Sequence, residues 1–294
     1  MKKNFIYIIT IVILSAAVII LLKKPVKTTD EFDTQLLRAD SLQLIEITYE
    51  HNGSRILLSK GLDKWQIREP GAYEPDPNTV RTILQFATGL TLKNIISEKP
   101  EKFSKFGVDS TGIVITLRKQ DNSRMSYIIG NDDKERNYSF FRLPEDNRVF
   151  LGTLFPRYRI TSDVKSWRNK AISQIRPADI KALSLLSGSD VLEISRNNDS
   201  WSILKNGKEV SVGKEKIEKS LNKLSAFNAS DFPSVDPFKD YAPGITLMIS
   251  TVNTKHEILL LKTPESSFAF RKDKSQAFKI SDEDYAVFED LLKK

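Results

Sequence analysis

The longest apolar run of the chain lies near its start. Phe5 to Leu22 are 18 uncharged residues between two pairs of lysines. As an α-helix this run would extend about 27 Å, close to the hydrocarbon thickness of a bilayer. The pattern predicts a single N-terminal transmembrane helix, a membrane anchor over 1–24 that contacts the lipid bilayer through residues 5–22. A cleaved signal peptide is the alternative, because Ser15-Ala16-Ala17 has the small residues that signal peptidases accept.

A polar segment over 25–41 follows the anchor. Pro25 ends the apolar run, and little apolar periodicity follows it, which predicts a stalk linker. Lysines flank both ends of the run, so the positive-inside rule hardly discriminates between orientations. An N-terminal anchor with a long C-terminal part usually leaves its short end in the cytoplasm, and this predicts a periplasm-like space for the rest. The lack of cysteine is compatible with that space.

Short alternating runs begin at Leu42 and predict β-strands. Asn52-Gly53 is a strong hairpin signal, and Asp76 before Pro77 is typical of a helix start. These signals predict a first repeat over 42–153 and a connector over 154–179. The predicted elements of the first repeat are strands over 44–49, 55–58 and 64–67, a helix over 77–90, and four strands over 113–118, 125–129, 138–143 and 148–151.

The same order of elements returns over 180–294, which predicts a second repeat. Trp65 and Trp201 open the third strand of each repeat. Phe106 follows Trp65 by 41 residues, and Tyr241 follows Trp201 by 40. The turns between strands are too short for crossovers, so the sheets are antiparallel. The fold class predicted is α+β, with two tandem repeats of β-meander, helix and β-meander after the transmembrane helix.

The net charge of +7 is unevenly distributed. Residues 1–27 contain five lysines and no acid, so they supply +5, and the remainder carries only +2. A mixed-sign surface is not the basic footprint of a nucleic-acid-binding protein. We therefore predict no nucleic-acid partner.

Candidate chemistry is sparse. His51 and His256 are each predicted at hairpin turns, without a second ligand at metal-binding spacing. Without cysteine there is no thiol nucleophile and no zinc ribbon. Asp132-Asp133, in the loop 130–134, lacks both P-loop spacing and the alternating oxygen ligands of an EF-hand. We predict no catalytic, cofactor-binding or metal-binding residue and no cofactor.

The three tryptophans differ in their expected roles. Equivalent positions on third strands favour core packing for Trp65 and Trp201, over a ligand-stacking pair. Trp167 lies in the connector and is the surface candidate. Arg157, Arg159 and Arg168 surround it with positive charge, which could meet an acidic partner or a lipid phosphate, or form a solvated face.

Several motifs of the first repeat carry a resemblance to a known family. They are the strand centred on Trp65 with the helix after it, Phe103-x-x-Phe106-Gly107-Val108-Asp109, Ile113 to Leu117, Ile128-Ile129-Gly130, Tyr138 to Leu143, and Val149-Phe150-Leu151. Together they resemble the DUF4340 family over about residues 42–152, and the second half resembles it more weakly. The resemblance implies a bacterial envelope protein, often linked with ABC-transporter auxiliary proteins of the gliding-motility type. The family has no agreed catalytic residues, so none is carried over.

We therefore expect a non-enzymatic, membrane-anchored envelope protein. It would be an accessory or scaffold subunit of an ABC-type transport or gliding-motility-associated system, and its partner an ABC permease or auxiliary subunit. The expected location is the bacterial inner membrane, single-pass, with the C-terminal domains in the periplasm. An envelope lipid- or glycan-binding module that uses the cleft between the two repeats is the alternative, and an enzyme is a third possibility.

Overall fold

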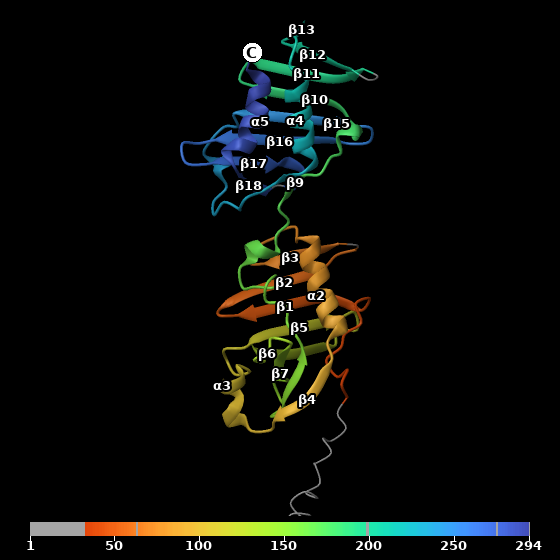
Figure 1. Cartoon of the computed structure of the whole chain (residues 1–294), viewed down its shortest axis with the longest axis vertical. Coiled ribbons are helices and arrows are strands. Elements are labelled where there is room, and N and C mark those ends of the chain that lie inside the picture. Colours follow the sequence, from red (N-terminus) through yellow and green to blue (C-terminus); the bar gives the residue numbers. More distant parts are fainter. Residues whose placement is uncertain (1–32, 63, 198–199, 275, 294) are drawn as a thin grey trace, which may run out of the picture. The chain divides into compact units, whose positions relative to one another are not determined.

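The computed structural model describes residues 33–62, 64–197, 200–274 and 276–293 (Figure 1). The anchor predicted over 1–24 and the lipid contact predicted through 5–22 lie outside the described residues. Within the described part, no helix has both the length and the apolar character needed to cross a membrane. Residues 33–41 of the predicted stalk pack on the fold, since Leu37 is fully buried and Ala39 N–H donates to the Ala87 carbonyl at 2.9 Å.

The predicted α+β fold class is wrong, because the described chain is mainly antiparallel β-sheet. The meanders that the sequence places before and after each helix do not form separate small sheets. They join edge to edge, through β1 with β5 and β10 with β15. Few helices remain beside these sheets, and each of them is short.

Eight strands of the described chain form the first sheet, in the order β3-β2-β1-β5-β6-β7-β8-β4. Helix α2 (Pro77–Gly89) covers one face, where Phe86 stacks on Phe141 with ring centroids 6.2 Å apart. The short helices η1 (Pro100–Lys102) and α3 (Phe103–Phe106) follow β4. The strands are β1 (Leu44–His51), β2 (Ser54–Lys60), β3 (Trp65–Glu69), β4 (Leu92–Ser97), β5 (Ile113–Lys119), β6 (Arg124–Asp132), β7 (Tyr138–Arg142) and β8 (Val149–Thr153).

The second sheet also has eight strands among the described residues, in the order β13-β12-β11-β10-β15-β16-β17-β18. The seven strands from β3 to β8 of the first sheet correspond in order to the seven from β12 to β18 of the second, and each sheet has one further edge strand, β4 beside β8 and β13 beside β12. A separate two-stranded ladder joins β9 (Ala171–Ser173) and β14 (Phe227–Asn228). The strands are β10 (Ile180–Ser187), β11 (Asp190–Asn197), β12 (Ser200–Lys205), β13 (Lys208–Glu209), β15 (Ile245–Thr251), β16 (Lys255–Lys262), β17 (Ser267–Arg271) and β18 (Gln276–Ile280).

Helices α4 (Lys214–Ser225) and α5 (Asp282–Leu292) pack against each other on one face of the second sheet (Figure 1). Ser281 caps α5 by accepting a hydrogen bond from Asp284 N–H at 3.1 Å. Apolar residues of both helices share one core with alternate residues of the strands. The remaining described short helices are η2 (Val164–Trp167), η3 (Pro177–Asp179), η4 (Pro237–Lys239) and η5 (Lys272–Lys274).

Contacts divide the chain into two compact units, and each is described by itself below. The first unit comprises Met1–Arg55 and Ile83–Arg157, and the second comprises Ile56–Thr82 and Tyr158–Lys294. The segment 56–82, with β2, β3 and the start of α2, therefore groups with the second unit.

Candidate functional site

Alternation along its strands gives the second sheet two different faces. Leu185 of β10 and Leu247 of β15 are fully buried in the core that includes α4 and α5. The neighbouring Leu186 and Met248 point the other way, because successive side chains of a strand lie on opposite faces. We call this other side, with Leu186, Thr246, Met248, Leu259 and Phe270, the open face of the second sheet.

Strand register places most side chains of the open face in one apolar row. Leu186 lies opposite Val191 on one side and Thr246 on the other. Leu259 lies opposite Thr246 and Phe270. All five side chains are half-buried. The row therefore crosses five adjacent strands without a charged residue.

Further apolar side chains extend this row. Phe238 of η4 packs on Phe270, with ring centroids 5.5 Å apart. Met248, two residues along β15 from Thr246 and on the same face, is 44% exposed. A contiguous apolar surface of this kind on a folded protein is typical of an interaction site.

The first sheet carries different chemistry at the equivalent positions. Its row runs from Glu50 through Val114 and Ile128 to Arg142. Both ends of this row are charged, whereas both ends of the matching stretch of the second sheet, Leu186 and Phe270, are apolar.

Helix α3 covers the corresponding face of the first sheet. Phe106 of α3 is only 8% exposed and packs on Phe140 with the ring planes tilted by 58° and the centroids 4.8 Å apart. Phe106 and Val108 form a small buried cluster with Ile128 and Val149. Because α3 covers this face of the first sheet, its apolar side chains are less open to solvent than the described row of the second sheet.

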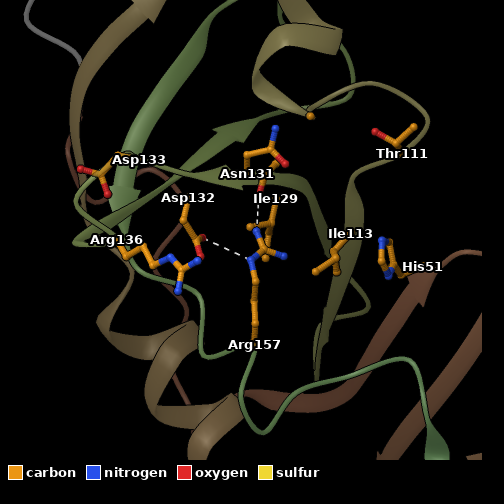
Figure 2. A pocket seen from close by; sticks show the side chains of 11 residues that line it. His51, Thr111, Ile113, Ile129, Asn131, Asp132, Asp133, Arg136 and Arg157 are labelled. Atoms are coloured by element: carbon orange, nitrogen blue, oxygen red, sulfur yellow. Dashed lines mark hydrogen bonds and ion pairs between the residues drawn. The ribbon is translucent and has the colours of Figure 1, made fainter.

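A polar pocket of about 440 Å³ lies in the first unit (Figure 2). Arg157 donates to Asp132 at 3.2 Å and to the Gly130 carbonyl. Ser139 Oγ donates to Asp132 at 2.6 Å and accepts from Phe155 N–H at 2.9 Å. This network holds the Arg157 side chain at the end of β6. The Arg157–Asp132 ion pair therefore stabilises the fold, whether or not a ligand binds in the pocket.

The rim of the pocket adds neutral and titratable polar groups. Figure 2 shows His51 and Thr111 on the side opposite Asp133 and Arg136, with Asn131 between them. Such groups can hydrogen-bond a small polar ligand. Among the described residues, no group of three His, Cys, Asp or Glu side chains is arranged to hold a metal ion.

Each unit contains one histidine. His51 ends β1 and contacts the Tyr49 ring edge-on at 6.4 Å. Burial raises the pKa of Tyr49 to about 12, and nearby Arg157 opposes this shift. His256, expected in a turn, lies in β16, where burial lowers its pKa and its Nε2 is 2.9 Å from Thr254 Oγ1.

The carboxylates of Asp132 and Asp133, in the loop 130–134, form hydrogen bonds within the fold. Asp132 pairs with Arg157 as described, and the Asp133 carboxylate accepts hydrogen bonds from Asn137 and Tyr138 N–H at 2.7 and 2.8 Å. Both carboxylates are therefore engaged in the turn between β6 and β7.

The surface role predicted for Trp167 is wrong. Its side chain is fully buried, and its Nε1 donates to the Thr161 carbonyl at 2.8 Å. Trp65 and Trp201, expected in the core, are half-buried, and Trp201 lies under the Arg196 guanidinium at 4.6 Å.

The three arginines that surround Trp167 in the sequence have different contacts. Arg157 lies in the pocket of the first unit, and Arg159 pairs with Asp76 at 3.1 Å. Arg168 is 9% exposed, and its guanidinium carbon lies over the Tyr73 and Phe232 rings, 3.9 and 3.6 Å from their centroids. The sequence shows three arginines in the connector, but it does not show that each contacts a different part of the fold.

The described residues form a mainly β protein. It has two eight-stranded antiparallel sheets, and the order of seven strands is the same in both. The family model of DUF4340, a domain of unknown function, matches residues 65–244. The chain therefore belongs to the DUF4340 family. This match begins at β3, later than residue 42, and it continues through the connector into the second sheet. No curated protein and no solved structure matches the chain.

Proposed function

We propose that this chain is a non-enzymatic accessory protein that binds another protein through the open face of the second sheet. The observation that carries the proposal is the uncharged row from Val191 to Phe270, which crosses five strands and is half-buried. Covering apolar surface stabilises an association by about 25 cal/mol per Å² before the costs of ordering are subtracted. A partner with an apolar face of its own fits this surface.

Charged residues beside the row give the contact its orientation. Glu193 lies on the same face, in the next row along the strands, and Ser184 and Met248 follow it across the sheet. Glu257 ends this stretch of the row and pairs with Lys272 at 3.0 Å. The Glu193 carboxylate beside an apolar centre favours a partner whose apolar patch carries a basic residue near it.

An ABC permease or auxiliary subunit is the partner that we propose, on the strength of the family resemblance. The role in ABC-type transport or gliding motility rests on the same resemblance. The lipid- or glycan-binding alternative stays a prediction.

A pull-down in mild detergent from native membranes, read by mass spectrometry, tests the proposal. The full-length wild-type chain is compared with Met248→Glu, which places a charge beside the apolar row at an exposed position. Ser195→Glu is the matched control, because Ser195 is exposed on the same face but lies at the other end of β11 from Val191. We expect the wild type and the control to recover ABC subunits and Met248→Glu to recover at least about tenfold less, the effect of 1.4 kcal/mol.

Two outcomes contradict different parts of the proposal. Equal recovery by Met248→Glu and the wild type would exclude the open face as the docking surface. Recovery of no ABC subunit by any of the three chains would exclude the accessory role.

A further inference from the structure

Arg168 is a buried cation whose guanidinium hydrogen-bonds to no described residue. It lies between the rings of Tyr73 and Phe232, at 3.9 and 3.6 Å from their centroids, and Nε is buried without an acceptor. Tyr73, Arg168 and Phe232 all belong to the second unit. Burial lowers the pKa of Arg168, against the opposing influence of Tyr73 and Asp231, but an arginine still stays protonated. A buried charge of this kind requires an anionic or polar partner.

A pocket of about 440 Å³ adjoins Arg168 within the second unit. Its wall includes Asn78, in the first turn of α2, and Lys170. The first N–H groups of α2 are not open to a ligand, because the Asp76 carboxylate, which also lines the pocket, accepts hydrogen bonds from Asn78 and Thr79 N–H. The cations of Arg168 and Lys170 therefore remain as the groups of this wall that can attract an anion.

The ion pairs around the pocket leave two cations unbalanced. Asp76 caps α2 and pairs with Arg159 at 3.1 Å. Lys165 pairs with Asp231 at 2.9 Å. Lys170 Nζ donates only to a neutral acceptor, the Ser230 carbonyl, at 3.4 Å. Arg168 and Lys170 therefore have no carboxylate partner among the described residues.

We propose that this pocket binds a phosphate monoester group, with Arg168 and Lys170 as its ligands. A phosphate monoester carries a charge of about −1.5 to −2 at neutral pH, which matches two unbalanced cations better than the single charge of a carboxylate. The rings of Tyr73 and Phe232 hold the guanidinium plane in place, so Arg168 loses little freedom when it binds.

Titration calorimetry of the full chain with inorganic phosphate, at constant ionic strength, tests this site. We expect saturable binding by the wild type and affinity lower by about tenfold or more in Lys170→Gln, because one charge-assisted hydrogen bond is lost. Arg168→Lys should weaken binding similarly, since lysine lacks the planar fork. Arg176→Gln is the matched control: Arg176 is a 79% exposed side chain that pairs with Asp179, and its loss should leave phosphate affinity unchanged.

The contradicting results are specific to the site. Absence of saturable heat with the wild type would overturn the proposal. An equal loss of affinity in Lys170→Gln and Arg176→Gln would show general electrostatic attraction instead, and acetate binding as tightly as phosphate would exclude the preference for a dianion. Lys170 is exposed and lies outside the ring stack, so its variant should fold and tests the site even if the Arg168 variant fails to fold.

Two further ligands distinguish the sources of the phosphate group. Binding of glycerol 3-phosphate as tight as that of phosphate would assign the site to small soluble esters. Binding to phosphatidate vesicles, but not to phosphatidylcholine vesicles, at concentrations where glycerol 3-phosphate stays unbound would assign it to a lipid headgroup.

Discussion

Phe270 of β17 and Phe238 of η4 face each other on the open face of the second sheet, with ring centroids 5.5 Å apart and ring planes at 48°. The first sheet has a related pair, Phe106 with Phe140, at 4.8 Å. Phe106 is 8% exposed, however, whereas Phe238 is only half-buried. A phenylalanine from a short helix therefore packs on each sheet, but the ring on the first sheet is buried and the ring on the second is partly open to solvent.

This difference predicts unequal effects of removing the two rings. Phe106→Ala should lower the free energy of unfolding by about 3–5 kcal/mol, because it leaves a cavity in a buried cluster. Phe238→Ala should lower it by only about 1–2 kcal/mol, since water already reaches the ring. Urea unfolding of the two variants measures both values. Equal losses would mean that η4 closes the second sheet as tightly as α3 closes the first.

The ion pair between Glu46 and Arg118 predicts a pH dependence of stability. The two groups are 2.6 Å apart, and the hydrogen bond from Arg118 lowers the pKa of Glu46 below its ordinary 4.5. The unfolded chain therefore binds this proton at a higher pH than the folded chain does. The stabilisation is fully present above pH 4.5 and is lost as the pH falls through the folded-state pKa.

Glu46→Gln isolates this contribution. The wild type should exceed the variant in free energy of unfolding by a constant amount above pH 5, about 0.5 unit above the ordinary pKa, and the difference should shrink as the solution becomes more acidic. Urea unfolding at a series of pH values measures it, with the exposed Glu101→Gln as control. A difference that stays constant down to the lowest pH would show that Glu46 does not titrate with folding.

Local signals were sufficient to predict many of the elements but not how they join. The helix predicted over 77–90 is α2, Pro77–Gly89, because Asp76 caps it through Thr79 N–H at 3.1 Å. The pairing of β1 with β5 spans the whole of α2 and β4, and no local pattern specifies it. This pairing merges two meanders into one sheet, which is why the expected α+β class failed.

The candidate sites were harder to predict than the elements, because each depends on contacts distant in sequence. Leu186 and Phe270 are unremarkable apolar residues until the strand register aligns them across the sheet. Trp167 lies in a connector without apolar periodicity, and its burial becomes visible only in three dimensions. Arg168 likewise resembles any connector arginine until Tyr73 and Phe232 enclose it.

The burial of Trp167 predicts that even a conservative change is costly. Trp167→Phe removes the donor to the Thr161 carbonyl and should lower the free energy of unfolding by about 1–3 kcal/mol. Trp65→Phe, at a half-buried ring, should lower it by under about 1.5 kcal/mol. Thermal or urea unfolding of both variants is the measurement. A smaller loss at Trp167 than at Trp65 would contradict its place in the core.

The close approach of α3 to β6 predicts that Gly130 tolerates no side chain. A Cβ at this position would meet the Phe106 carbonyl oxygen and would lie 2.6 Å from Val108 Cγ1. Gly130→Ala should therefore lower the free energy of unfolding by about 1–3 kcal/mol as α3 moves away from the strand. Gly61→Ala is the control, because the one contact within 4 Å of its Cβ position is an ordinary one, 3.5 Å from the Lys64 carbonyl oxygen. It should change stability by less than about 0.5 kcal/mol in urea unfolding.

The hydroxyl of Tyr127 predicts a substitution that stabilises the protein. Tyr127 is fully buried between strands, its hydroxyl has no hydrogen-bond partner among the described residues, and burial raises its pKa. Folding therefore removes this hydroxyl from water without compensation, a penalty of about 1–3 kcal/mol. Tyr127→Phe keeps the ring contact with Phe141 and should raise the free energy of unfolding by about 1 kcal/mol.

Tyr127→Leu is the control, because it removes the ring as well as the hydroxyl and should lower the free energy of unfolding. Urea unfolding of the two variants separates the effect of the hydroxyl from that of the ring packing. A loss of stability in Tyr127→Phe would show that the hydroxyl has a bonding partner in solution.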